Sequence, residues 1–536
     1  MHNHSLTRFH LLLVFIASTI PRIIGAIWLP NAFGDAYAYT EQTYYLRRTL
    51  LNGSFSISSL FGFWLPLYQL ICAIISAVVG NSFYVPKLVS AICGGGICVL
   101  VCAITWELTR SKWSTWAATT VVAVNPYHIF YSSSAMTDVP HAFFILLCAY
   151  CCIKRRWWLA SIFALSAGLM RIESWILIPI IPVAHFMSSP ANNLKPWWRL
   201  LKSIALFVCL TIGPIFWLFV SWKATGSLGK YFEIRNQYIL ETLAGNPWLA
   251  SFSISRVAFD LLRLNYIVNP LVICGAVTLL LHLNRAVSVS MKRLSWFCNL
   301  LGTTQGLVLT FFCSHLAFLL IAYATKNQPE MWPRYGLIFF ALGLPLLAQY
   351  SSSKDFKERG FNRRKALTIY AAALLFAIQF CVQLIDVTRM TVKSDPNVIA
   401  AEFLEDQHKA DKTVKIYCDD GAIRVLSGIP LEEFRNQYNS PVDEKAFIQS
   451  LRDNQVRYLV YKDLPGSPLQ KFIRELRSGG VRNGITIEEV VPTPRKPMKD
   501  NVVVYRVHES EMANAQNRAT KVPRSASSHP RRTEAP

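Results

Sequence analysis

The feature of this sequence that most limits its fold is a succession of long apolar runs separated by short basic clusters. A helix needs about 20 apolar residues to cross a bilayer. Only 16% of the residues are charged, against roughly 25% in soluble domains. The candidate membrane-spanning runs are Phe9–Leu29, Tyr84–Trp106, Trp113–Tyr131, Ala135–Ile153, Trp157–Met170, Trp175–Met187, Ser203–Trp222, Tyr266–Leu283, Leu300–Tyr323, Tyr335–Tyr350 and Ala366–Ile385. The pattern predicts a polytopic α-helical membrane protein with about 11 transmembrane helices and excludes a soluble enzyme.

The positive charge of the chain, +22 in total, is gathered in these short clusters. Such clusters are typical of cytoplasmic loops, so we expect no nucleic-acid partner. One further run, Trp64–Gly80, decides the topology. If it lies in the interface or re-enters, the N-terminus is inside and most Lys and Arg of the membrane half are cytoplasmic. If it crosses, everything after it flips and most of them are outside. The first arrangement is favoured, and it puts most acids of the membrane half on the outer side, where we expect the chemistry.

After Asp386 the composition becomes that of a small α/β domain. Helices are expected at Gly421–Leu426 and Pro468–Arg477. Asp419-Asp420-Gly421 follows the first strand and could be a site, but Asp-Gly after a strand is more often a turn. The expected strands are Thr413–Asp419, Val456–Lys462, Ile485–Val491 and Asn501–Val507. We therefore predict a transmembrane domain over residues 1–386, an extracytoplasmic α/β domain over 387–509, and a disordered tail over 510–536.

Three polar positions in the outer loops are candidates for chemistry, and each has a structural alternative. Asp35 follows the first span and precedes an amphipathic aromatic stretch; it could be a general base or the N-cap of that helix. Asp138 lies where one apolar run gives way to the next and could also be a helix cap. Arg171 and Glu173 lie between two short spans and could form an ion pair that holds a tight turn. None of the three patterns is decisive alone.

Together these positions resemble the GT-C membrane glycosyltransferases, and within them family 39, which includes the protein O-mannosyltransferases and the lipid A aminoarabinose transferase. Gly34-Asp35 with the following tyrosines is similar to the first-loop motif. Trp64-Leu65-Pro66-Leu67-Tyr68 is similar to a family segment that lies along the membrane. Asp138 resembles the acid of the second outer loop, and Arg334-Tyr335 resembles the Arg-Tyr pair that opens a late span. The resemblance covers about residues 10–350. It departs at Ala36, where members often have a second acid, and at Trp64 and Leu65, where they have His and Pro.

The resemblance implies a polyprenyl-phosphate sugar donor bound from the bilayer and inverting transfer of the sugar to an acceptor on the outer side. The acceptor hydroxyl must lose a proton, which needs a carboxylate, and Asp35 is the candidate base. The leaving phosphate needs fixed cations, although each candidate could instead reach toward the lipid headgroups without a role in catalysis. Asp138 would orient the acceptor or a donor hydroxyl. The candidate phosphate-binding residues are Arg334, Arg235 and Arg171, and the candidate substrate-binding residues are Glu173 and Tyr39.

No second-loop Asp-x-Asp and no His/Cys cluster with metal-ligand spacing is present, so the sequence predicts no metal site and leaves a divalent-metal requirement open. Two other functions stay possible: a transporter or flippase of a lipid-linked sugar, and a catalytically silent assembly partner. The acceptor could be protein, lipid or polysaccharide. The membrane could be a bacterial inner membrane or that of the endoplasmic reticulum.

Overall fold

The chain divides into two compact units, residues 1–392 and 393–536. The structure is a computed structural model, and each unit is considered by itself. It describes residues 6–32, 34–188, 195–245, 247–250, 253–265, 272, 301–328, 330–352, 363–391, 396–418, 420–435, 444–462, 485–491 and 502–509.

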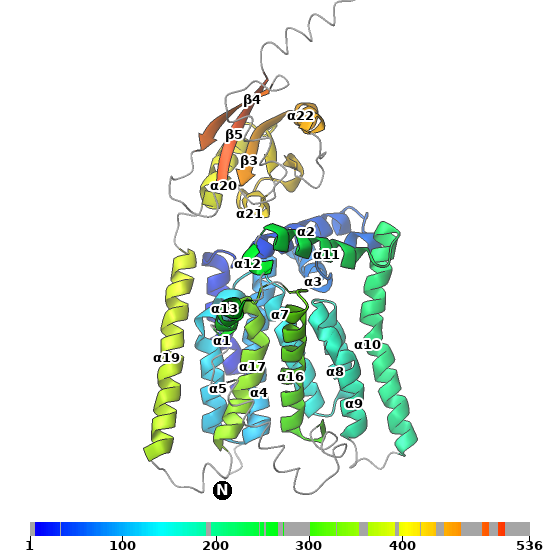
Figure 1. Cartoon of the computed structure of the whole chain (residues 1–536), viewed down its shortest axis with the longest axis vertical. Helices are drawn as coiled ribbons and strands as arrows, with labels where there is room; N and C mark the ends of the chain where they lie inside the picture. The colour runs from blue at the N-terminus through cyan, green and yellow to red at the C-terminus, as the bar shows by residue number, and fades with distance from the viewer. Residues whose placement is uncertain are drawn as a thin grey trace, which may run out of the picture. The chain divides into compact units, whose positions relative to one another are not determined.

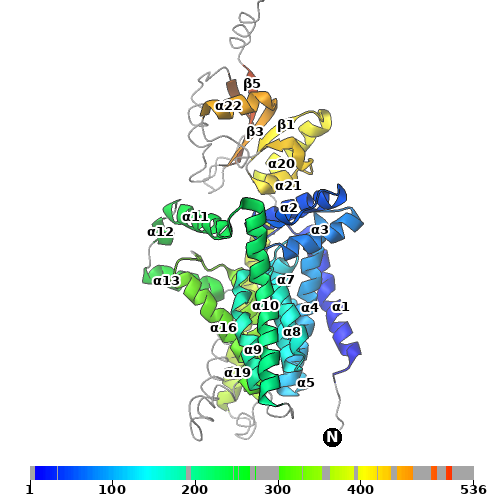
Figure 2. The ribbon, with the colours of Figure 1, turned by 90° about the vertical axis from the view of Figure 1, so that its right-hand side faces the viewer.

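The first unit is helical, and its longer helices run side by side (Figures 1 and 2). The α-helices described are α1 (Arg8–Trp28), α2 (Gly34–Leu51), α3 (Leu67–Val79), α4 (Tyr84–Thr109), α5 (Lys112–Val124), α6 (Pro126–Ser132), α7 (Asp138–Ile153), α8 (Trp157–Gly168), α9 (Leu177–Met187), α10 (Pro196–Thr225), α11 (Lys230–Gly245), α12 (Pro247–Ala250), α13 (Ile254–Asn265), α16 (Thr304–Ala324), α17 (Gly336–Ser352) and α19 (Arg363–Thr391). Short 3-10 turns are η1 (Ile57–Leu60), η2 (Ile172–Ile176) and η3 (Pro333–Tyr335).

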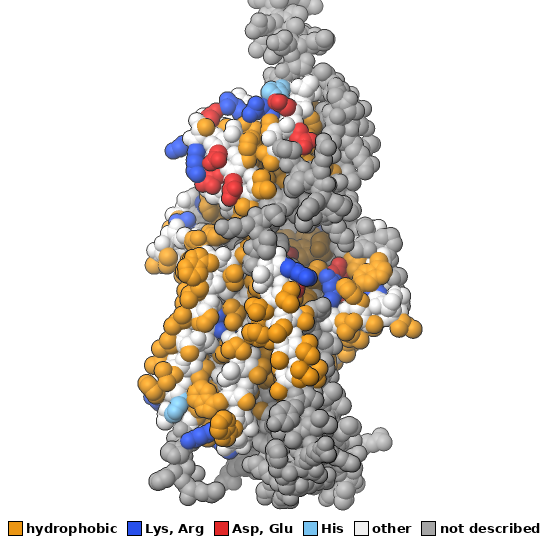
Figure 3. Space-filling view, turned by 90° about the vertical axis from the view of Figure 1, so that its left-hand side faces the viewer, with side chains coloured by type: hydrophobic (Ala, Val, Ile, Leu, Met, Phe, Trp, Pro, Cys, Tyr) orange, Lys and Arg blue, Asp and Glu red, His pale blue; other side chains and the backbone are white. Residues whose placement is uncertain are grey.

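Four of the described helices, α1, α4, α10 and α16, are each long and apolar enough to cross a membrane. The surface agrees with this, because exposed Ile, Leu and Trp side chains such as Ile20 on α1, Trp113 on α5 and Ile378 on α19 face outward. In the view of Figure 3 many apolar side chains lie on the visible surface of the described helices. The unit is therefore a membrane protein with several apolar helices. The predicted span Tyr266–Leu283 lies almost entirely outside the described residues.

Helix α4 is the centre of the bundle, and most residues of its apolar stretch are buried. Its glycines allow neighbouring helices to approach closely. A Cβ on Gly95 would lie 1.9 Å from Oγ1 of Thr19 on α1, and a Cβ on Gly94 would lie 2.3 Å from Oγ of Ser132 on α6. Small residues at helix contacts are typical of membrane bundles, where packing rather than the hydrophobic effect drives association.

The predicted span Trp113–Tyr131 is not one continuous helix, because the structure breaks it into α5 and α6 at Asn125. Asn125 takes an extended backbone conformation (φ −60°, ψ 121°), and its side-chain oxygen accepts a hydrogen bond from the backbone N–H of His128 at 2.8 Å. Pro126 then occupies the first position of α6. An Asn cap followed by proline starts a new helix, since proline lacks an N–H and disfavours a helical residue before it.

The run Trp64–Gly80, on which the topology depends, forms the short helix α3. Its 13 residues span about 20 Å, less than the hydrocarbon thickness of about 30 Å. Gly80 ends it in the left-handed conformation that glycine adopts freely (φ 84°). Helix α3 packs along α2, and both lie with α11 across one end of the bundle (Figures 1 and 2).

The second unit is built on a five-stranded sheet in the order β2-β1-β3-β5-β4. Strand β1 pairs in parallel with β2 and β3, whereas β5 pairs antiparallel with β3 and β4. Buried residues such as Tyr417, Leu459 and Tyr505 give this unit its own core. The described elements are α20 (Pro396–Ala410), β1 (Lys415–Cys418), α21 (Gly421–Leu426), η4 (Leu431–Glu433), β2 (Phe434–Arg435), α22 (Glu444–Asp453), β3 (Val456–Lys462), β4 (Ile485–Val491) and β5 (Val502–Glu509).

The four predicted strands correspond to β1, β3, β4 and β5, and the helix at Gly421–Leu426 is α21. Asp420, from the Asp-Asp-Gly sequence, caps that helix by accepting from the backbone N–H of Ala422 at 2.8 Å and of Ile423 at 3.2 Å. The helix expected at Pro468–Arg477 lies outside the described residues. The sequence missed β2, which is two residues long, and the helices α20 and α22.

Candidate active site

The first site residue, Asp35, comes from α2. It lies in the first turn of the helix, one residue after Gly34, where the positive end of the helix dipole favours a carboxylate. Its Oδ2 forms an ion pair with Nη1 of Arg334 at 2.8 Å. Arg334 belongs to η3, immediately before α17, so the contact joins segments far apart in the sequence. The Asp35 side chain is 38% exposed and that of Arg334 is 12% exposed.

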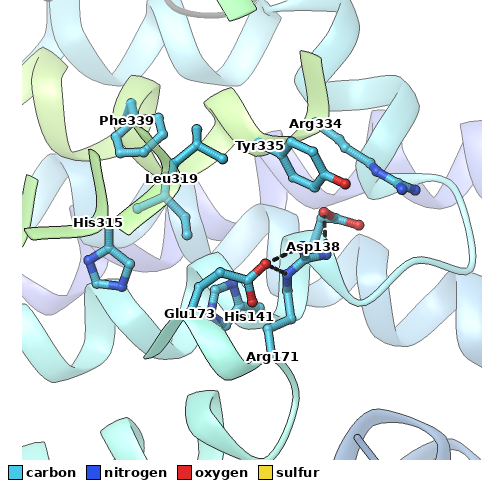
Figure 4. Close-up of a pocket in the computed structure, with 10 residues that line it drawn as sticks. Asp138, His141, Arg171, Glu173, His315, Leu319, Arg334, Tyr335 and Phe339 are labelled. Carbon is cyan, nitrogen blue, oxygen red and sulfur yellow. Dashed lines mark hydrogen bonds and ion pairs between the residues drawn. The ribbon is translucent and has the colours of Figure 1, made fainter. Parts of the chain in front are cut away.

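A second, more buried cluster joins α7 to the turn between α8 and α9 (Figure 4). Nη1 of Arg171 lies 2.8 Å from Oδ1 of Asp138, the first residue of α7. Nη2 of the same guanidinium lies 2.6 Å from Oε1 of Glu173 in η2. The ion pair that the sequence allowed between Arg171 and Glu173 is present, but the arginine also holds Asp138. Oδ2 of Asp138 is buried and has no hydrogen-bond partner among the described residues.

A small cavity of about 30 Å³ adjoins both clusters. Acidic, basic and apolar side chains from α7, η2, α16, η3 and α17 surround it. Its lining comprises Asp138, His141, Arg171, Glu173, His315, Leu319, Arg334, Tyr335, Ile338 and Phe339. Space of this size admits about two water-sized groups.

Tyr335 lies near both arginines that line the cavity. Its ring centroid is 5.3 Å from Cζ of Arg171 and 5.4 Å from Cζ of Arg334, within the range of cation–π attraction. Its hydroxyl accepts a hydrogen bond from the side-chain amide of Gln328 at 2.8 Å. The aromatic ring is therefore placed to attract both cations.

Groups of opposite charge beside the cavity hold one another in their charged forms. Burial disfavours the charged form of Glu173, but the guanidinium of Arg171 outweighs this effect and lowers the pKa of Glu173 to about 2. Burial likewise disfavours charged Arg171, yet Glu173 and Asp138 raise its pKa well above the usual value. For Arg334, Tyr335, Asp138 and Asp35 outweigh burial and raise the pKa. Both arginines are thus permanent cations beside the cavity.

Three predicted site residues, Asp35, Tyr39 and Arg235, lie outside the cavity lining. Tyr39 on α2 is buried; its hydroxyl accepts from Oγ1 of Thr137 at 3.1 Å and its ring packs edge-on against Tyr68. Burial and the nearby Asp35 raise the pKa of Tyr39. Arg235 on α11 is half-buried and hydrogen-bonds to the side chain of Tyr231. It is close enough to contribute to the lowered pKa of Glu173.

The structure adds two histidines that sequence reasoning did not single out. Nε2 of His141 lies 2.6 Å from Oγ of Ser174. His315 comes from α16, where a polar residue inside an apolar helix could have drawn attention to it, because such residues are costly in a membrane and default to function. No group of three or more His, Cys, Asp or Glu in the described ranges is placed to hold a metal ion.

The chain is similar to one protein family and to a solved structure. Residues 36–172 match the family model of dolichyl-phosphate-mannose-protein mannosyltransferases. The fold is similar to the crystal structure of ArnT from Cupriavidus metallidurans bound to undecaprenyl phosphate, with 12% identity, a TM-score of 0.52, and coverage of 93% of this chain and 98% of that chain. The apo state of the same protein gives 11% identity, a TM-score of 0.45, and coverage of 92% and 97%. A search of curated proteins finds no match.

The fold and the matched region define a helical membrane glycosyltransferase of GT-C type. Residues 36–172 are similar to the dolichyl-phosphate-mannose-protein mannosyltransferase family, and the resemblance predicted from the sequence is confirmed. The matched region runs from α2 to the start of η2 and so contains Asp138 and Arg171, whereas Asp35 immediately precedes it and Arg334 lies far beyond it. The similarity to ArnT shows the fold alone.

Proposed function

We propose that the chain transfers a sugar, with inversion at the anomeric carbon, from a polyprenyl-phosphate donor to an acceptor on the extracytoplasmic side. The observation that carries the proposal is the pairing of a partly exposed carboxylate, Asp35, with a buried permanent cation, Arg334, beside a cavity in a chain of this family. The polyprenyl-phosphate donor is proposed from the family description and from the undecaprenyl phosphate bound to ArnT, whose fold is similar.

In the proposed reaction the acceptor oxygen forms a bond to the anomeric carbon while the bond from that carbon to the phosphate oxygen breaks. The hydroxyl proton passes to the carboxylate of Asp35, and the leaving phosphate keeps the electron pair as negative charge. Fixed cations that meet this charge lower the barrier because they need no reorganisation. Arg334 is the first candidate for this cation, since Asp35 is its ion-pair partner and is partly exposed. Arg171 already forms ion pairs with the carboxylates of Asp138 and Glu173, and Arg235 lies outside the cavity lining.

Inversion imposes a geometric condition on this pair. The attacking and leaving oxygens lie on opposite sides of the anomeric carbon, so base and phosphate-binding cation cannot remain bonded to each other at 2.8 Å. The donor phosphate would take the place of the Asp35 carboxylate on Arg334 and release Asp35 to accept the proton. The phosphate and the carboxylate are both anions that a guanidinium group binds through two parallel hydrogen bonds. The exchange therefore replaces one charged contact by another of the same kind.

Transfer assays on membranes test this proposal. Radiolabelled polyprenyl-phosphate monosaccharides are offered one at a time to membranes that contain the wild-type chain or the Asp35→Asn variant. The proposal expects label to leave the lipid for an acceptor in wild-type membranes only. Movement of the intact lipid-linked sugar across the membrane without its consumption would support a transporter instead. Consumption of none of the donors would support a silent assembly partner.

A further inference from the structure

We propose that the cavity binds a hydroxyl-bearing part of the donor sugar between His315 and Asp138, and that His315 is therefore a residue that determines which sugar is accepted. The inference rests on the proposed function, because it assumes that a lipid-linked sugar is the ligand. It adds a residue on α16, outside the matched region 36–172 and outside every position that the sequence motifs named.

The first observation is the state of the His315 ring, which is 3% exposed. Its Nδ1 lies 2.9 Å from the backbone carbonyl oxygen of Phe311, one helical turn earlier. A carbonyl only accepts, so Nδ1 must carry a hydrogen and donate it. In the neutral ring Nε2 is then an acceptor. Nε2 is buried and has no hydrogen-bond partner among the described residues.

The second observation is the second carboxylate oxygen of Asp138. Arg171 holds Oδ1 at 2.8 Å, whereas Oδ2 is buried without a partner in the described part of the chain. Asp138 as a whole is 4% exposed. Buried polar atoms are nearly always hydrogen-bonded, and each exception needs an explanation. Two such acceptors on one small cavity are explained if a ligand brings the missing donors.

The lining indicates which donors these are. Its two arginines balance the carboxylates of Asp138 and Glu173, so a neutral donor fits better than an ammonium group. A hydroxyl is the neutral donor that a sugar supplies. Space for about two water-sized groups suits a hydroxymethyl group or neighbouring hydroxyls rather than a whole sugar ring. Leu319, Ile338 and Phe339 give apolar walls for the adjoining C–H groups.

Such a site discriminates between sugars. A protein site built to hydrogen-bond a hydroxyl rejects an analogue that lacks it, because its buried acceptors are then left without partners. The alternative is that water fills the cavity and that His315 has only a structural role in α16. The two explanations differ in what a substitution of His315 does to binding. If His315 binds the sugar, only the sugar-bearing lipid should bind more weakly; if its role is structural, bare and sugar-bearing lipids should be affected equally.

Binding to the purified full-length chain separates these cases. The probes are undecaprenyl phosphate and the undecaprenyl-phosphate derivatives of mannose, glucose, galactose and arabinose. We expect at least one sugar derivative to bind the wild type more tightly than the bare lipid phosphate. His315→Phe keeps a ring but removes the acceptor, and should weaken that derivative about tenfold to a hundredfold while bare undecaprenyl phosphate is unaffected. His315→Gln, which returns an acceptor, should restore part of the difference. His185→Phe is the matched control, since His185 is also buried and bonded, to Ser203, away from the cavity.

Deoxy derivatives of the tightest-binding sugar give a second measurement that needs no variant. Removal of one particular hydroxyl should weaken binding to the wild type by about the same factor as His315→Phe. The inference is overturned if His315→Phe weakens bare and sugar-bearing lipids equally, or if no sugar improves on the bare lipid phosphate. The lipid-donor proposal survives both of those results. It fails separately, and takes the inference with it, if the wild type does not bind undecaprenyl phosphate at all.

Discussion

At the scale of single residues, Asp35 is the position where the catalytic and structural interpretations separate most clearly. It lies in the first turn of α2, so its charge also favours the helix, and its replacement by Asn costs only this charge–dipole effect of about 0.3–1 kcal/mol. Asn cannot accept a proton from a hydroxyl. We therefore expect Asp35→Asn to fold and to bind undecaprenyl phosphate at least as well as wild type, since Arg334 loses an anionic competitor, while sugar transfer falls at least about a hundredfold.

Glu233→Gln is the control for this substitution, because Glu233 is an exposed acid on α11 that forms an ion pair with Lys230 at 3.1 Å, outside the cavity lining. Its transfer rate should match that of the wild type. Near-normal transfer by Asp35→Asn would remove Asp35 from the mechanism, and Asp138 would become the candidate base.

Arg334 gives the second prediction at this scale. If its guanidinium binds the donor phosphate, Arg334→Ala should weaken undecaprenyl-phosphate binding about tenfold to a hundredfold, the effect of losing a hydrogen bond to a charged group. Arg334→Lys should recover only part of this, because an ammonium group cannot reproduce the two-pronged contact. Lys230→Ala, at an exposed cation on α11, serves as the control. Equal affinities for wild type and Arg334→Ala would leave this arginine a structural partner of Asp35.

Glu173 allows a prediction about pH. Its folded-state pKa of about 2 lies below the ordinary value of 4.5, so its charge stabilises the fold above pH 4.5. That contribution, up to about 3 kcal/mol, is lost as pH falls from 4.5 toward 2. In detergent, Glu173→Gln should melt below the wild type at pH 7, and the difference in Tm should shrink steadily below pH 4.5. A difference that does not change with pH would mean that shape, and not charge, accounts for the effect.

At the scale of elements, the ends of α4 and α19 determine which parts of the chain share a side of the membrane. Helix α4 begins beside α3 and its 26 residues span about 39 Å, enough to carry the chain across. Helix α19 ends at Thr391 at the same end of the bundle as α2 (Figure 1). The chain that follows α19 should therefore begin on the outer side.

Single cysteines at Gln42, Lys112 and Ser450 test this arrangement in a chain whose 13 native cysteines, including the exposed Cys381, are replaced by Ser. Gln42→Cys and Ser450→Cys should react with an impermeant thiol reagent applied from outside. Lys112→Cys should react only after the membrane is opened. Labelling of Gln42→Cys and Ser450→Cys from opposite sides would mean that α3 or another segment crosses differently, and the outer location of the acids would be wrong as well.

The elements differ in how far the sequence could predict them. Uniform apolar composition made α1 and α4 easy to find, and β-branched runs located β3 and β4 to the residue. The break at Asn125 was missed because the segment is apolar on both sides of it. The two residues that cause the break, the capping Asn125 and Pro126, leave no trace in the average hydrophobicity. Strand β2 was missed because two residues carry no periodic pattern, and its pairing with β1 is decided by the sheet.

The candidate site shows the same limit. The sequence motifs identified four charged residues of the site, Asp35, Asp138, Arg171 and Arg334. Which arginine pairs with which aspartate depends on helices that are distant in sequence. That Arg334 meets Asp35 while Arg171 meets Asp138 follows from how η2 and η3 approach α2 and α7, which no local pattern encodes. His315 belongs to no motif, and only the orientation of α16 brings its ring to the cavity.

At the scale of the whole molecule, the candidate site belongs to one unit. Asp35 and every residue that lines the cavity precede Val392, the last residue of the first unit. The main buried core of the helical unit lies within the same unit, between Val14 and Ala348. The second unit has a separate core around its sheet. We therefore predict that residues 1–392 alone bind undecaprenyl phosphate with the affinity of the full chain.

The fragment of the second unit, residues 393–509, should be soluble and unfold cooperatively. Leu459→Ala should lower its free energy of unfolding by about 2–5 kcal/mol because Leu459 is fully buried.

Binding of undecaprenyl phosphate by residues 1–392 together with loss of transfer would assign the second unit to the acceptor, because the donor site would then be intact. Loss of lipid binding in a well-folded 1–392 fragment would instead mean that the donor site needs residues of both units.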